Sequence, residues 1–125
     1  MTATVAIVGG RDFNDYALLK TKLDEIRTVY PTIMGVVSGG ARGADRLGER
    51  YADEHLLGMR VLRPDWQRYG RGAAMMRNTD IIDAAGIVVA FWDGKSRGTR
   101  DSIKKAQQQR KILFVYHYDG SIHEF

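Results

Sequence analysis

One glycine-rich segment of this sequence has the composition of an anion-binding loop. Residues 38–45 read SGGARGAD, with three glycines ahead of a helical pattern. Glycines let a backbone approach a ligand closely, and free N–H groups at a helix start favour a negative charge. Arg42 can add a two-pronged contact to phosphate or carboxylate. The segment favours phosphate or nucleotide contact, the alternative being a tight turn that only packs a helix against a sheet.

A second segment, residues 96–99 (SRGT), also opens a helical pattern. Ser96 or Thr99 can cap that helix, which would be a purely structural role. The same hydroxyls and Arg97 could instead hold a phosphate. Two helix starts directed at one cleft favour a phosphate-bearing ligand more strongly than either does alone.

Carboxylates stand among these arginines. In residues 9–13 (GGRDF), Arg11 would meet a phosphate and Asp12 a ribose hydroxyl, or the two would form a surface ion pair of little energy. Asp45 and Asp93 likewise could contact a ribose hydroxyl or form a surface ion pair. Because carboxylates repel a bare phosphate, the mixture indicates a ligand with both a phosphate and a sugar.

Three aromatic residues are candidates for stacking on a base, and each has packing at the rim of the core as its alternative. They are Phe13, Trp66 and Trp92. No metal site is expected, because the chain has no cysteine and its three histidines lack metal-ligand spacing. The absence of cysteine also excludes disulfides and thiol catalysis, and no cofactor is expected.

Composition indicates one ordinary globular domain over residues 1–125. The chain is 44% apolar and 27% charged, with a net charge of +4 that favours an anionic ligand. No apolar run approaches the roughly 20 residues of a membrane span, and the N-terminus has no signal-peptide pattern. We therefore expect a cytoplasmic protein without membrane contact.

The elements that must position these residues alternate in type. Helical periodicity covers residues 16–30 (with Asn14 or Asp15 as the cap), 43–57, 73–84 and 99–109. Apolar runs predict strands at 4–8, 33–37, 59–62, 86–91 and 112–116, and residues 121–125 add an edge strand or fray. Residues 63–72 are expected to be a loop.

Five strands alternating with helices predict a single, three-layer α/β/α domain with a mostly parallel five-stranded sheet and helices on both of its faces. Ligands of such sheets bind beyond the carboxyl ends of the strands. The polar, glycine-rich segments all follow strands, so they should lie on one rim of the sheet.

Taken together, these segments resemble the SLOG superfamily, which is named for the DprA/Smf DNA-processing proteins and the LOG (Lonely Guy) enzymes, and more narrowly its YspA-type branch. The resemblance spans residues 7–103 and rests on segments 9–13, 38–45, 65–70, 77–78 and 91–99. It implies a Rossmann-like nucleotide-binding domain that forms a homodimer. Superfamily members include phosphoribohydrolases, sensors of ADP-ribose-like signals in phage conflict, and DprA, which binds single-stranded DNA.

The departures concern catalysis. LOG enzymes carry a Pro-Gly-Gly-x-Gly-Thr-x-x-Glu motif, whereas residues 94–102 here read GKSRGTRDS. Ser102 stands where the catalytic glutamate would be and cannot supply its charge. Asp101 is one residue early, which turns it by about 100° on a helix. Arg77 resembles the arginine of those enzymes, so Arg77 and Asp101 are the candidate catalytic residues.

Three functions follow as alternatives. The favoured one is a sensor, carrier or sequestering protein for a nucleotide or ADP-ribose-like ligand, with a role in phage–host conflict. The second is a phosphoribohydrolase-like enzyme, and the third is DprA-like nucleic-acid binding. The residues expected to bind the ligand are Gly9, Gly10, Arg11, Asp12, Phe13, Ser38, Gly39, Gly40, Arg42, Gly43, Ala44, Asp45, Asp65, Trp66, Arg77, Asn78, Trp92, Asp93, Ser96, Arg97, Gly98 and Thr99.

Overall fold

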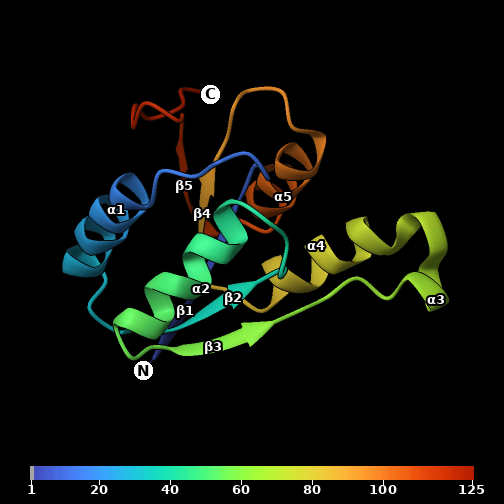
Figure 1. The fold of residues 1–125 in the computed structure, drawn as a ribbon, viewed down its shortest axis with the longest axis horizontal. Coiled ribbons are helices and arrows are strands. Elements are labelled where there is room, and N and C mark those ends of the chain that lie inside the picture. Colours follow the sequence, from blue (N-terminus) through green and yellow to red (C-terminus); the bar gives the residue numbers. More distant parts are fainter. Residues whose placement is uncertain (1) are drawn as a thin grey trace.

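The fold is built on a five-stranded parallel sheet. A computed structural model describes residues 2–125 and orders the strands β3-β2-β1-β4-β5 (Figure 1). Their bounds are β1 Ala3–Gly9, β2 Ile33–Ser38, β3 Gly58–Val61, β4 Ile87–Phe91 and β5 Ile112–Tyr116. Every strand pair of the sheet is parallel. The predicted fold class is confirmed, and the C-terminal segment adds one antiparallel bridge between Tyr116 and Ile122.

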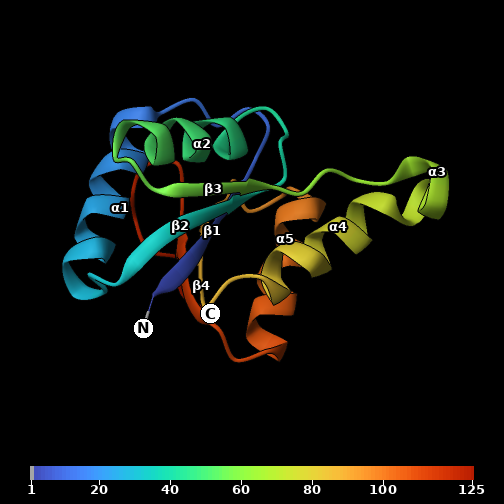
Figure 2. The ribbon, with the colours of Figure 1, turned by 90° about the horizontal axis from the view of Figure 1, so that it is seen from below.

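Helices cover both faces of the sheet (Figures 1 and 2). One face carries α1 (Tyr16–Val29) and α2 (Ala44–Glu54), and the other carries α4 (Ala73–Asp83) and α5 (Arg97–Gln108). The two apolar clusters of the core match this division, one under each helix pair. The three-layer α/β/α arrangement therefore rests on two separate interfaces with a shared sheet.

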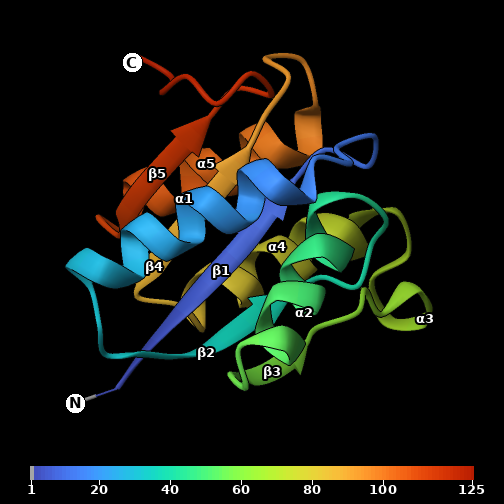
Figure 3. The ribbon, with the colours of Figure 1, turned by 60° about the vertical axis from the view of Figure 1, so that its left-hand side comes forward.

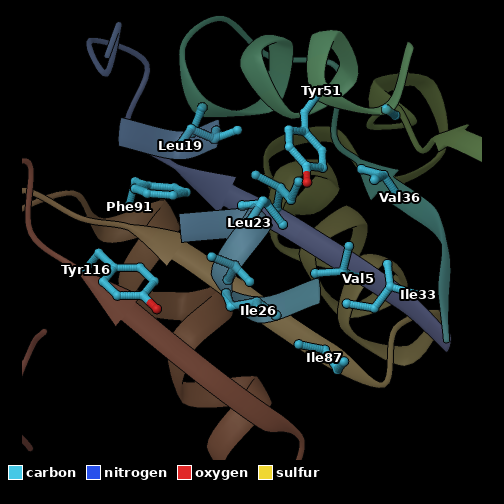
Figure 4. Packing of buried hydrophobic residues seen from close by; sticks show 14 of the residues in the cluster. Val5, Leu19, Leu23, Ile26, Ile33, Val36, Tyr51, Ile87, Phe91 and Tyr116 are labelled. Carbon is cyan, nitrogen blue, oxygen red and sulfur yellow. The ribbon is translucent and has the colours of Figure 1, made fainter. Parts of the chain in front are cut away.

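Helix α1 shows why the apolar spacing of the sequence produces this packing. Leu19, Leu23 and Ile26 recur at three- and four-residue spacing and are all buried against the sheet (Figure 4). Asp15 caps the helix by accepting a hydrogen bond from the Leu18 N–H at 3.1 Å. Tyr51 of α2 fills the space between the two helices and is fully buried.

Residues 63–72, expected to be a loop, are partly helical. They contain α3 (Trp66–Tyr69) and a 3-10 turn, Gly70–Gly72, which together extend away from the sheet in Figures 1 and 2. We call residues 63–72 the arm. None of the residues in its helical parts is buried, and the four residues of α3 are too few to show a helical period in the sequence. Its one helical signal is Asp65, which caps α3 by accepting from the Arg68 N–H.

The sheet topology places a crevice beside β1. The chain leaves β1 toward β2 on one side, and β4 pairs with β1 on the other side, as Figure 3 shows with α1 and α2 in front. Such a change of direction opens a space at the carboxyl ends of the two strands. Within residues 2–125, no helix combines the length and apolarity needed to cross a bilayer.

Candidate functional site

A cleft of about 400 Å³ occupies this crevice. Its walls are the end of β1 with the loop that follows, the segment before α2, one side of α4 and the start of α5. Pockets that bind small molecules have volumes of roughly 300 Å³ or more, so the cleft has room for a mononucleotide. The lining residues are Val8, Gly9, Gly10, Arg11, Asp12, Ala41, Asp45, Ala74, Met75, Arg77, Asn78, Ile81, Ser96, Gly98, Thr99 and Ser102.

The loop after β1 is held by the start of α2. The Ala44 N–H donates to the Gly10 carbonyl at 3.2 Å, which brings the two backbones together. Gly43 lies at this contact with φ +79° and ψ −130°, a conformation that L-residues avoid. A Cβ at this position would overlap the Gly10 carbonyl and lie 2.7 Å from the Arg11 Cα. Glycine is therefore required here to shape one wall of the cleft.

Asp45 brings a buried carboxyl group to the cleft. Asp45 is only 7% exposed, and its Oδ2 accepts a hydrogen bond from the Ala41 N–H at 3.1 Å. Burial raises the pKa of Asp45 to about 6; the Ala41 N–H and the nearby Arg77 limit this rise, and Glu49 adds to it. A carboxyl group with that pKa can either accept a hydrogen bond from a sugar hydroxyl or donate a proton near neutral pH.

Side-chain hydrogen bonds from Arg77 and Asn78 connect α4 with the segment before α2 and with the start of α5. The Arg77 Nη1 donates to the Gly39 carbonyl at 2.7 Å, and its Nε donates to the Asn78 Oδ1 at 3.2 Å. The Asn78 Nδ2 donates to the Gly98 carbonyl at 3.3 Å and to the Asp101 carboxylate at 3.2 Å. Burial lowers the pKa of Arg77, with Asp45 opposing that effect. These contacts fix the orientation of the guanidinium.

The start of α5 is held by the loop that precedes it. The Asp93 carboxylate accepts the N–H groups of Lys95 and Ser96, both at 2.8 Å, and these bonds lower the pKa of Asp93. The Ser96 hydroxyl oxygen caps the helix by accepting from the Thr99 N–H at 3.4 Å. Asp93 therefore supports the helix start from outside the cleft.

Arg11 is the exposed cation on the loop after β1. It takes part in no salt bridge within the described part of the chain. Its neighbour Asp12 is held by the Tyr118 hydroxyl, which donates to Oδ1 at 2.6 Å. The loop thus presents a positive charge while its carboxylate is already bonded to the C-terminal segment.

The cleft gathers fewer than half of the residues expected to bind a ligand. Those lining it are Gly9, Gly10, Arg11, Asp12, Asp45, Arg77, Asn78, Ser96, Gly98 and Thr99. The others lie outside its lining: Phe13, Ser38, Gly39, Gly40, Arg42, Gly43, Ala44, Asp65, Trp66, Trp92, Asp93 and Arg97. Ligand contact by either set stays a prediction.

Two of the three aromatic candidates are packed in the interior. Phe13 is 2% exposed and stacks on Phe91, with ring centroids 4.7 Å apart. Trp92 is 8% exposed and donates its indole N–H to the Ser96 carbonyl at 3.1 Å. Both therefore take the packing alternative, and only Trp66 presents an open ring.

Asp101, a candidate catalytic residue, does not line the cleft. Its Oδ2 accepts from Lys105 at 2.8 Å and from Asn78 at 3.2 Å, so it links α4 to α5. Ser102, one residue later, does line the cleft at the position of the missing glutamate.

Six lining residues were absent from the expected set. They are Val8, Ala41, Ala74, Met75, Ile81 and Ser102. The apolar ones carry no chemical signal in the sequence, since they look like ordinary core positions. Ala41 and Ser102 belong to the two glycine-containing motifs and could have been included on that ground.

Among residues 2–125 no cluster of three or more His, Asp or Glu side chains could hold a metal ion. His117 and His123 do approach each other, with 3.1 Å between ring nitrogens, at the C-terminal end of the sheet.

Comparison with known proteins identifies relatives of both sequence and fold. The model of the "YspA, cpYpsA-related SLOG family" matches residues 3–69. The Gene 61 protein of Mycobacterium phage D29 is 34% identical over an alignment of 114 positions, and the alignment covers 83% of this chain and 88% of that protein.

Two solved structures of DNA processing protein A share the fold. The Helicobacter pylori protein, described for its single-stranded DNA binding mode, has a TM-score of 0.69 and 24% identity over 91% of this chain. The Streptococcus pneumoniae protein has a TM-score of 0.70 and 17% identity over 92%. The present chain spans 65% and 50% of these two proteins, respectively.

Proposed function

This chain belongs to the YspA, cpYpsA-related SLOG family, and on that premise we propose that its cleft binds a nucleotide or nucleotide-derived ligand through a phosphate group. One observation carries the proposal: Arg11, the Gly9-Gly10 backbone and the start of α5 line the same cleft. An exposed guanidinium and a helix start that line one cleft together favour a phosphate. Asp45 adds an acceptor for a sugar hydroxyl.

We propose that the protein senses, carries or sequesters this ligand. An ADP-ribose-like signal fits a site with both phosphate-binding and sugar-binding groups. The similarity to a phage protein supports a role in phage–host conflict.

Calorimetric titration with adenosine, AMP and ADP-ribose tests the proposal. We expect AMP or ADP-ribose to bind and adenosine to bind at least about tenfold more weakly, because only the first two carry phosphate. Equal binding of adenosine and AMP, or no binding of any nucleotide by the folded protein, would contradict the proposal.

Arg11→Ala should weaken binding of the nucleotide by about tenfold or more, since the phosphate loses a charge-assisted contact. Arg46→Ala is the matched control, because Arg46 is also an exposed arginine that forms no salt bridge within residues 2–125, and it does not line the cleft. The same titration measures both variants. Equal losses for the two would show that overall charge, and not the cleft, holds the ligand.

A second candidate function is hydrolysis of an N-glycosidic bond, and Asp45 is the observation that favours it. A carboxyl group with a pKa of about 6 beside a nucleotide cleft has the protonation range of a general acid. Chromatography of free base released from nucleoside monophosphates tests this function. If the wild-type protein releases free base and Asp45→Asn abolishes this release, the protein is an enzyme. If the nucleotide is still intact after long incubation, the protein binds the nucleotide without hydrolysing it.

A further inference from the structure

The arm, residues 63–72, presents two aromatic side chains that are open to solvent. Trp66 is 57% exposed and Tyr69 is 38% exposed, and both belong to α3, which has no buried residue. Figures 1 and 2 show α3 at the outer end of the segment that projects from the sheet. Large aromatic rings in such a position are typical of a surface that contacts another molecule.

The arm is also positively charged. It contains three arginines and one carboxylate, and the carboxylate, Asp65, accepts the Arg68 N–H at 3.1 Å. Arg63, Arg68 and Arg71 are exposed and form no salt bridge within residues 2–125. The Arg68 guanidinium lies 5.1 Å from the centre of the Tyr69 ring, so charge and aromatic surface are interleaved.

We propose that the arm binds a single-stranded nucleic acid, whose bases stack on Trp66 and Tyr69 while Arg68 and Arg71 contact its phosphates. Proteins that hold single strands combine aromatic stacking surfaces with nearby cations, because every base has a stacking face and every nucleotide has a phosphate. This inference goes beyond the proposed function, since it stands on residues outside the cleft.

The charge of the arm favours this partner over a second copy of the chain. A twofold contact between two arms would place arginines opposite arginines, with one carboxylate per arm to offset them. A polyanion has no such conflict. The arm leads directly into α4, where Ala74, Met75 and Arg77 line the cleft, so a strand on the arm would run toward that site.

Tryptophan fluorescence tests the arm directly, because the chain has two tryptophans in contrasting positions. Trp66 is 57% exposed, whereas Trp92 is 8% exposed and does not line the cleft. We expect a short oligothymidylate or oligouridylate, about twelve nucleotides long, to quench the emission of the wild-type protein through Trp66. An oligodeoxyuridylate of the same length differs from the oligouridylate in the sugar alone, so comparison of these two strands identifies which sugar is preferred.

Variants separate stacking from charge. Trp66→Ala should weaken oligonucleotide binding, followed by anisotropy of a labelled strand, by about tenfold, whereas Trp66→Tyr should keep most of the affinity and lose the quenching. Arg68→Ala and Arg71→Ala should each lower the salt slope by about 0.7. Arg110→Ala, beyond the far end of α5, removes a charge outside the arm and should leave that slope unchanged.

Three results would overturn the inference. They are the absence of oligonucleotide binding, an unchanged affinity in Trp66→Ala, and sedimentation of a dimer in which Trp66 is protected from a soluble quencher without nucleic acid. AMP binding by Arg71→Ala keeps the two proposals distinguishable, because this variant removes an exposed cation of the arm, leaves the lining of the cleft intact and should retain its AMP affinity. Failure of oligonucleotide binding by the arm would therefore not decide whether the cleft binds a nucleotide, which the AMP titration measures separately.

Discussion

Gly43→Ala is expected to cost about 3 kcal/mol of unfolding free energy and to weaken nucleotide binding by at least about tenfold. The backbone conformation of Gly43 is one that L-residues avoid, at a cost of roughly 1–3 kcal/mol. In addition, a methyl group here would press on Gly10 and Arg11, and overpacking typically costs a further 1–3 kcal/mol. Relief of that overlap would move the loop that carries Arg11 away from its place in the cleft. Urea unfolding and calorimetric titration measure the two effects.

Gly70→Ala provides a close control for this substitution. Gly70 has φ +55° and ψ −128°, close to the values at Gly43, but a Cβ there would meet nothing within 4 Å. Because the exposed arm can relax, we expect a loss of about 1 kcal/mol and unchanged nucleotide binding. Equal destabilisation by the two variants would show that the close approach of α2 to the β1 loop does not matter.

Asp45→Asn is expected to stabilise the nucleotide-free protein by roughly 2–3 kcal/mol at about pH 7.5. Burial raises the pKa of Asp45 from 3.8 to about 6, so the folded protein binds this proton more tightly than the unfolded chain does. The stabilisation that protonation provides is complete below about pH 4 and is lost as the pH rises through about 6. Asparagine removes the charge whose burial is unfavourable, and its side-chain oxygen can still accept the Ala41 N–H.

Thermal unfolding of this variant at about pH 4 and about pH 7.5 gives the comparison. The stabilisation should be present at the higher pH and nearly absent at the lower one. Asp53→Asn, at an exposed position of the same helix, should change stability by less than about 0.5 kcal/mol at either pH. A stabilisation independent of pH, or a destabilised Asp45→Asn at the higher pH, would contradict this account of Asp45.

Much of the fold could be predicted because it depends on local patterns. The uninterrupted apolar run Ile87–Phe91 identifies a strand buried on both faces, and all five of its residues are buried in β4. The spacing of Leu19, Leu23 and Ile26 likewise identifies the buried face of α1. Parallel strands then place every polar segment that follows a strand on one rim of the sheet.

The lining of the cleft could not be predicted in the same way, because it depends on contacts between distant residues. Phe13 follows a glycine pair as a ligand-binding aromatic would, but its partner Phe91 comes from β4. Arg11 and Arg42 have equivalent sequence surroundings, yet only Arg11 lines the cleft. That difference is set by where α4 and α5 close the crevice. Local sequence patterns do not specify such an arrangement.

A crystal structure with bound AMP is the most direct test of the phosphate site. We expect the phosphate to lie in the cleft, within hydrogen-bonding distance of the Arg11 guanidinium and of a backbone N–H at the start of α5, with the ribose toward Asp45. A phosphate bound on the arm or elsewhere on the surface, with the cleft empty, would contradict it.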